Sequence, residues 1–99
     1  ENTSVSGTPD LLGYNDFGRY FTVELKVSRS NKVNLSPHQI AYHVTHPKNS
    51  FILVKALAAS RVKLYEGSQI KQLVACGLKL EACRFGLVAC GLYLSELGA

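Results

Sequence analysis

Two carboxylates and a lysine in the N-terminal half of the sequence have types and a spacing suited to metal-ion chemistry. Asp10 follows Pro9, and Glu24 and Lys26 come after thirteen intervening residues, with one leucine between them. Alternate side chains of a strand leave the same face, so Glu24 and Lys26 would share a face with Cα atoms about 6.6 Å apart. A hairpin centred between residues 16 and 17 would pair Asp10 with Val23, one residue from Glu24.

The chemistry that such a group supports is hydrolysis of a phosphodiester. Two converging carboxylates repel each other unless a cation lies between them. Carboxylate oxygens suit Mg²⁺, which keeps several waters and takes a phosphate oxygen as a further ligand. The metal activates water and stabilises the charge that develops on the phosphate. A neighbouring lysine can hold that water or a phosphate oxygen.

A β-hairpin is predicted to position these residues. Residues 10–14 form a short apolar run, and residues 20–27 form a longer one that is rich in β-branched and aromatic side chains. Between them, residues 15–18 read Asn-Asp-Phe-Gly, which is a turn signal. The polar residues 28–34 are expected to form a loop.

A helix and two further strands should complete the sheet. Ser36 is expected to cap the helix, with Pro37 at its first position, and Pro47 should end it. Residues 51–57 are almost continuously apolar, as in a central strand that is buried on both faces. Residues 61–66 predict another short strand. The order strand, helix, strand implies a right-handed parallel crossover.

The remainder of the chain is predicted to be helical from residue 69 onward, with Ser68 as its cap. The sequence Leu-Val-Ala-Cys-Gly-Leu occurs at 73–78 and again at 87–92, four helical turns later. Gly86 either breaks this helix or permits close packing. Leucines and cysteines recur at steps of seven, and the leucines form either a dimer surface or part of the monomer core. The residues concerned are Leu73, Leu80, Leu87 and Leu94, and Cys76, Cys83 and Cys90.

The segment Gly-Thr-Pro-Asp-Leu-Leu-Gly from residue 7, followed by Tyr-Phe-Thr-Val-Glu-Leu-Lys-Val from residue 20, resembles the PD-(D/E)xK nuclease superfamily. The similarity is greatest to its small Holliday-junction-resolvase-like and VRR-NUC-like endonucleases, which are often found in phages. It covers residues 6–66 and includes the Ser-Pro-His-Gln sequence that begins at residue 36. The resemblance implies an α/β fold with a restriction-endonuclease-like core, in which helices flank a mixed sheet of about four strands.

The resemblance also implies a role for each matching residue. Asp10, Glu24 and the backbone carbonyl of Leu25 would bind Mg²⁺ or Mn²⁺, Lys26 would position or activate water, and Gln39 would orient a phosphate or a ligand water. His43, four residues after Gln39, is a candidate supporting group behind these residues. Members of this branch commonly act on duplex or branched DNA as homodimers. Many also carry an acidic residue in an N-terminal helix, for which Glu1 is the sole upstream counterpart here.

Several more ordinary interpretations stand beside this one. Glu24 and Lys26 could be a surface pair, Gln39 a solvated residue of the first helical turn, and the three histidines simple surface or core residues. The loop cations are candidates for contact with the DNA backbone, although a solvated rim is a similarly good interpretation. These cations are Arg19, Arg29, Lys32 and Lys48. The alternative functions are a non-catalytic nucleic-acid-binding module that retains the nuclease fold, and a pure interaction domain.

Length and composition set the frame for all of these predictions. The chain has 99 residues, of which 46% are hydrophobic and 18% charged, with a formal charge of +4. These values suit a single domain over residues 1–99, with a nuclease-like core at 6–66 and a C-terminal helical segment at 68–97. No apolar run approaches a membrane span.

Three cysteines, an odd number, suggest small buried residues or a seam against a second subunit, and a reducing compartment. The absence of an initial Met suggests a trimmed N-terminus, and a cytoplasmic location in a bacterium or phage-infected cell is expected.

Overall fold

The computed structural model describes residues 9–57 and 61–98, which form a mixed α/β fold with a five-stranded sheet and three α-helices. Residues 1–8, which include Glu1, lie outside the described part of the chain. The strands lie in the order β1-β2-β3-β4-β5. Their bounds are Leu11–Tyr14 (β1), Tyr20–Ser28 (β2), Ser50–Ala56 (β3), Arg61–Glu66 (β4) and Arg84–Phe85 (β5). The α-helices are Pro37–Thr45 (α1), Ile70–Cys76 (α2) and Leu87–Ser95 (α3), and short 3₁₀ turns cover Gly67–Gln69 and Gly77–Lys79.

The predicted hairpin, crossover helix and next two strands are all present. β1 and β2 pair antiparallel, β2 and β3 pair parallel across α1, and β3, β4 and β5 follow antiparallel. Ser36 caps α1 as expected, and the helix ends before Pro47. The central strand is also confirmed, because Phe51, Ile52 and Val54 of β3 are fully buried.

The hairpin register differs by one residue from the predicted one. Leu11 pairs with Val23, and continuing that register by one residue places Asp10 opposite Glu24. The cause is a turn with an odd number of residues, centred on Phe17. Asn15 builds this turn, since its side-chain oxygen accepts hydrogen bonds from the backbone N–H groups of Phe17 and Arg19 at 3.0 and 3.1 Å. In this register Asp10 lies just before the residue that pairs with Val23, so it is the hairpin position that corresponds to Glu24.

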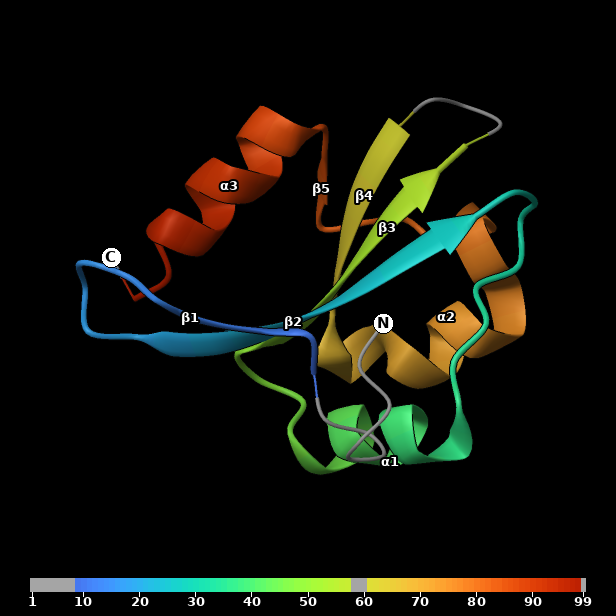
Figure 1. Ribbon diagram of the computed structural model, residues 1–99, viewed down its shortest axis with the longest axis horizontal. Helices are drawn as coiled ribbons and strands as arrows, with labels where there is room; N and C mark the ends of the chain where they lie inside the picture. Colours follow the sequence, from blue (N-terminus) through green and yellow to red (C-terminus); the bar gives the residue numbers. More distant parts are fainter. Residues whose placement is uncertain (1–8, 58–60, 99) are drawn as a thin grey trace.

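The sheet lies between two layers of helices (Figure 1), with α1 and α2 on one face and α3 on the other. The first core, under α1 and α2, includes Ile52, Val54, Tyr65, Ile70 and Leu73. The second core, under α3, includes Val23, Phe51, Leu64 and Cys90. Side chains alternate along β2, so Thr22, Glu24 and Lys26 share the face that carries α1. In the part of the chain that the structure describes, no helix is long and apolar enough to cross a membrane.

The expectation of continuous helix from residue 69 is wrong, and the mixed sheet has five strands where about four were expected. α2 ends at Cys76 because Gly77 adopts φ 66°, and the next amide, that of Leu78, donates to the Asn31 carbonyl at 2.7 Å. Gly86, at φ 84°, then separates α3 from a two-residue fifth strand. Positive φ values of this kind are open to glycine and strained for other residues.

The break in the helix also removes the heptad stripes. The leucines and cysteines that recur at steps of seven lie on separate elements, so neither set forms one helical seam. Leu73 is fully buried and Leu80 and Leu94 pack against the cores, whereas Leu87 is exposed. Cys76 is exposed, Cys83 partly buried and Cys90 buried. The predicted dimer surface therefore does not exist in the form proposed.

Candidate functional site

The best-defined polar contact on the α1 face of the sheet joins Gln39 to Glu24. The Glu24 side chain is only 2% exposed, and its Oε2 accepts a hydrogen bond from Gln39 Nε2 at 2.9 Å. The other end of the Gln39 amide accepts from the backbone N–H of Ser36 at 2.9 Å, within a capping box in which Ser36 Oγ accepts from Gln39 N–H. Gln39 is buried, so it is not a solvated helix residue, and the start of α1 fixes the Glu24 carboxylate.

Asp10 is held at the neighbouring position by the backbone of β2. Its Oδ2 accepts a hydrogen bond from the Leu25 N–H at 2.8 Å, at the edge of the strand. The N–H and C=O of one residue in a strand point to the same side, so the Leu25 carbonyl lies on the edge that Asp10 occupies. Glu24 and Leu25 are thus consecutive residues of β2, and Asp10, just before β1, contacts the backbone of Leu25.

Lys26 lies beside this group and borders an open hollow of about 540 Å³. The hollow is lined by Asp10, Leu11, Leu25, Lys26, Val27 and Asn34. Lys26 is two residues from Glu24 on the same strand, so the two side chains leave the sheet on one face. Asp10 and Lys26 therefore border the same hollow, which Glu24 does not line.

The donor set at this edge fits Mg²⁺. Over residues 9–57 and 61–98, no cluster of three or more His, Cys, Asp or Glu side chains could hold a metal ion. A site built from two carboxylates and one backbone carbonyl does not need such a cluster, because protein-bound Mg²⁺ commonly takes one or two carboxylates and completes its shell with water and substrate phosphate. All three donors are hard oxygens, which this cation prefers over nitrogen and sulfur.

His43 is buried behind the site, one helical turn after Gln39, and its side chain is 1% exposed. Its Nδ1 lies 3.1 Å from Ser50 Oγ, and the Ser50 hydroxyl donates in turn to the His46 carbonyl. Since that hydroxyl has only one proton to donate, His43 Nδ1 must carry a hydrogen and donate to it. His43 Nε2 is then the unprotonated nitrogen, and within the described residues it has no hydrogen-bond partner.

Burial of His43, with a smaller contribution from the nearby His46, lowers the pKa of the ring from 6.5 to about 4. Below pH 6.5 the His43 ring becomes protonated in the unfolded chain, whereas in the folded protein it stays neutral until about pH 4. Acid therefore favours unfolding. Between pH 7.5 and pH 5.0 we expect this residue to cost the wild type about 2 kcal/mol of unfolding free energy. Urea unfolding at the two pH values should show that loss reduced in His43→Gln. The exposed His38→Gln variant is the control and should retain it; an unchanged loss in His43→Gln would contradict the assignment.

The other two histidines do not join His43 in a metal site. His38 is exposed on α1. The His46 ring stacks on Tyr42 with a centroid separation of 4.4 Å, and its Nδ1 lies 3.0 Å from the Tyr42 carbonyl oxygen. The spacing of three residues between His43 and His46 therefore reflects packing and capping at the end of α1.

The four candidate DNA-contacting cations are all exposed, and the structure does not gather them into one patch. Arg19 precedes β2 and Lys48 precedes β3, so in these parallel strands they lie at the same end of the sheet. Arg29 and Lys32 follow β2, at the opposite end. The nine residues of β2 lie between Arg19 and Arg29, which are therefore about 33 Å apart along the extended chain. The site therefore has one pair of cations at each end of the strand that carries it.

Ser50 and Gly67 belong to the site and were not singled out from the sequence. Ser50 pairs with Thr22 in the register of β2 and β3 and is buried beside His43. A Cβ atom at Gly67 would overlap Ser50 Oγ and lie 3.3 Å from His43 Nδ1. A serine at the start of a strongly apolar strand was the available signal, because a buried hydroxyl requires a hydrogen-bond partner.

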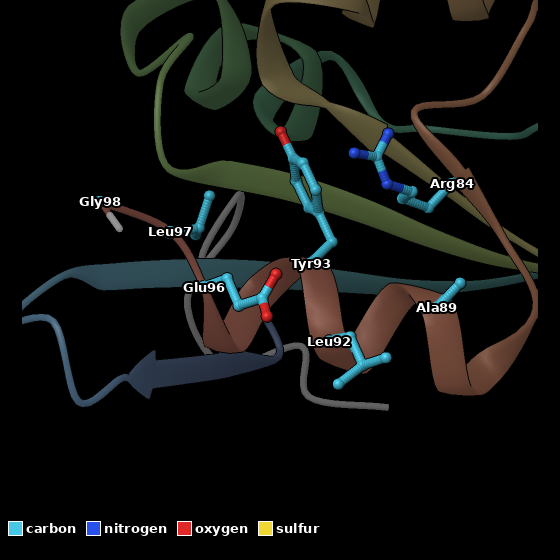
Figure 2. Close-up of a pocket in the computed structure, with 7 residues that line it drawn as sticks. All are labelled: Arg84, Ala89, Leu92, Tyr93, Glu96, Leu97 and Gly98. Carbon is cyan, nitrogen blue, oxygen red and sulfur yellow. The ribbon is translucent and has the colours of Figure 1, made fainter.

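A second hollow, of about 450 Å³, lies on the opposite face of the sheet beside α3 (Figure 2). The Arg84 guanidinium carbon lies 4.7 Å from the centroid of the Tyr93 ring, a cation–π contact. Burial is the main cause that raises the pKa of the Tyr93 hydroxyl. This contact joins β5 to α3 and is separated by the sheet from Glu24 and Lys26.

Comparisons of this chain with protein-family models, with curated proteins and with solved structures gave no match.

Proposed function

We propose that the protein is a metal-dependent DNA endonuclease of the PD-(D/E)xK type. The observation that carries the proposal is the pair of hydrogen bonds that fixes the two acids, from Gln39 to Glu24 at 2.9 Å and from the Leu25 N–H to Asp10 at 2.8 Å. The order of elements supports it further: an acid begins a hairpin, the Glu-x-Lys follows on its second strand, and the crossover helix supplies the glutamine.

Each residue of this group has a distinct part in the proposed reaction. Asp10, Glu24 and the Leu25 carbonyl would hold Mg²⁺, which when bound supplies charge stabilisation to a phosphodiester undergoing hydrolysis. Lys26 would orient the attacking water or a phosphate oxygen from the open hollow. Gln39 keeps the Glu24 carboxylate in one orientation, so the site is preorganised before substrate binds. His43, Ser50 and Gly67 support α1 from behind.

Three expectations from the resemblance stay predictions: the DNA partner, the homodimer and the cytoplasmic location.

The alternative function, a nucleic-acid-binding module without catalysis, makes a different prediction from the endonuclease. It would bind DNA and leave it intact with every divalent metal. Measurements of cutting and binding on the same protein separate the two.

The test is cleavage of supercoiled plasmid and of a four-way DNA junction with Mg²⁺ or Mn²⁺. We expect the wild type to nick at least one of these substrates, and Lys26→Ala to be about 100-fold slower. Lys55→Ala is the matched control, because Lys55 is an exposed lysine on the opposite face of the neighbouring strand. An intact substrate with both metals, or a Lys26→Ala variant as fast as Lys55→Ala, would overturn the proposal.

A further inference from the structure

Two tyrosines face solvent side by side on the hairpin that carries the site. Tyr14 and Tyr20 are register partners on β1 and β2, their ring centroids are 4.5 Å apart, and they are 62% and 64% exposed. Alternation along β2 puts Tyr20 on the same face as Thr22 and Glu24. The hairpin extends well past α1, so no helix of the described residues covers this part of that face (Figure 1).

These rings contribute little to the core of the protein. The neighbouring Phe21, on the opposite face of β2, packs against the core beneath α3, whereas Tyr14 and Tyr20 remain outside both cores. Leu12, which pairs with Thr22 between the tyrosines and Glu24, is exposed as well. The result is an apolar, aromatic strip that begins at the tyrosines and ends at the proposed metal site.

A cation lies at the tyrosine end of this strip. Lys48 is next to Asn49, whose carbonyl accepts a hydrogen bond from the Thr22 N–H at 2.9 Å. Arg19 directly precedes Tyr20, but its side chain leaves the opposite face of the hairpin and lies against Gly98. Asp16, in the hairpin turn, is the acidic residue nearest to them in sequence. Exposed aromatic rings with a cation at the same end of the sheet suit single-stranded nucleic acid, because bases stack on the rings and phosphates pair with the charge.

The distance along the strip fits the same ligand. Glu24 lies four residues after Tyr20 along β2, which is about 13 Å of strand. Stacked nucleotides rise about 3.4 Å each, so this interval corresponds to roughly four of them. A duplex hides its base faces, whereas an unpaired strand presents them. We propose, on the basis of the proposed function, that Tyr14 and Tyr20 stack the bases of a single-stranded segment of the DNA substrate.

The test is fluorescence anisotropy with a labelled 20-nucleotide single strand and the matching duplex, in EDTA so that no cutting occurs. We expect the wild type to prefer the single strand. Tyr14→Leu/Tyr20→Leu should weaken that binding at least ~10-fold, while Tyr14→Phe/Tyr20→Phe, which retains both rings, should bind like the wild type. Phe85→Leu, an exposed aromatic on β5, is the control. Thermal unfolding of each variant checks the fold.

The outcomes separate this inference from the proposed function. Single-strand binding that is unchanged in the folded double leucine variant, a preference for duplex, or no binding by the wild type would each overturn the stacking role. Tyrosine-dependent binding by a protein that cuts no DNA with Mg²⁺ or Mn²⁺ would overturn the endonuclease proposal and support the stacking role. DNA cutting that is equally fast in the wild type and in the double leucine variant would support the endonuclease proposal and overturn the stacking role.

Discussion

Replacement of Glu24 by glutamine is expected to reduce Mg²⁺-dependent DNA cleavage by about 100-fold or more. The variant Glu24→Gln keeps the volume of this buried side chain and an oxygen that can accept the 2.9 Å hydrogen bond from Gln39 Nε2. It removes the negative charge that the proposed metal requires. Rates of plasmid nicking for variant and wild type, at equal protein and Mg²⁺ concentrations, measure the effect.

The stability of the same variant decides how a loss of cleavage is interpreted. We expect Glu24→Gln to unfold in urea within about 1 kcal/mol of the wild type, because a neutral isostere retains the packing. Glu81→Gln is the matched control, since Glu81 is an exposed glutamate remote from β2, and it should cut normally. Full activity in Glu24→Gln, or an equal loss in Glu81→Gln, would be incompatible with a catalytic metal at Glu24.

Adding one methyl group at Gly67 is expected to lower the free energy of unfolding by about 2–3 kcal/mol. In Gly67→Ala the new Cβ would overlap the buried Ser50 Oγ and lie 3.0 Å from the His46 carbonyl oxygen. Relief requires movement of the Ser50 hydroxyl, which links His43 to the end of α1. Urea unfolding at pH 7.5 measures the cost directly.

Gly91→Ala is the control for this prediction, because it is expected to raise the free energy of unfolding. Gly91 lies inside α3, and a Cβ there would meet no atom within 4 Å. Alanine is a better helix former than glycine by up to about 1 kcal/mol, so this variant should be more stable than the wild type. Equal effects of the two substitutions would show that the packing around Gly67 is not as described.

The repeated hexapeptide shows why the C-terminal part of the fold could not be predicted from sequence. Leu-Val-Ala-Cys-Gly-Leu ends a helix in its first copy and lies within α3 in its second. The difference comes from Asn31, whose side chain donates to the Cys76 carbonyl and whose own carbonyl accepts from Leu78. Those contacts hold Gly77 at positive φ. Gly91 has no such neighbour, so tertiary contacts decide between identical local sequences.

The hairpin, α1, β3 and β4 were predictable because their signals are local. Strand composition marked β2, and Ser36 and Pro37 marked the start of α1. The register of the hairpin was not predictable, because it depends on how the Asn15 side chain bonds to its own turn. The shift of one residue matters for the site, since it places Asp10 opposite Glu24.

The candidate site was predictable in its residues and less so in its contacts. The Asp, Glu and Lys pattern and the glutamine of α1 were expected from the resemblance. The Gln39 side chain both completes the cap of α1 and holds Glu24. This double contact depends on the packing of the helix on β2 and is not visible in the sequence. The burial of His43 and its bond to Ser50 depend on the parallel register and on Gly67, which lie outside local sequence signals.

The most direct test of the central claim is where a divalent metal binds, because it does not require knowledge of the preferred DNA. Manganese titrated into ¹⁵N-labelled protein broadens NMR signals of groups close to the bound ion. We predict that the Leu25 backbone amide and the Gln39 side-chain amide broaden first, that α3 amides such as that of Leu92 are spared, and that Asp10→Asn abolishes the effect. Signals that broaden elsewhere first, or stay sharp at the Asp10 and Glu24 edge, would contradict the account.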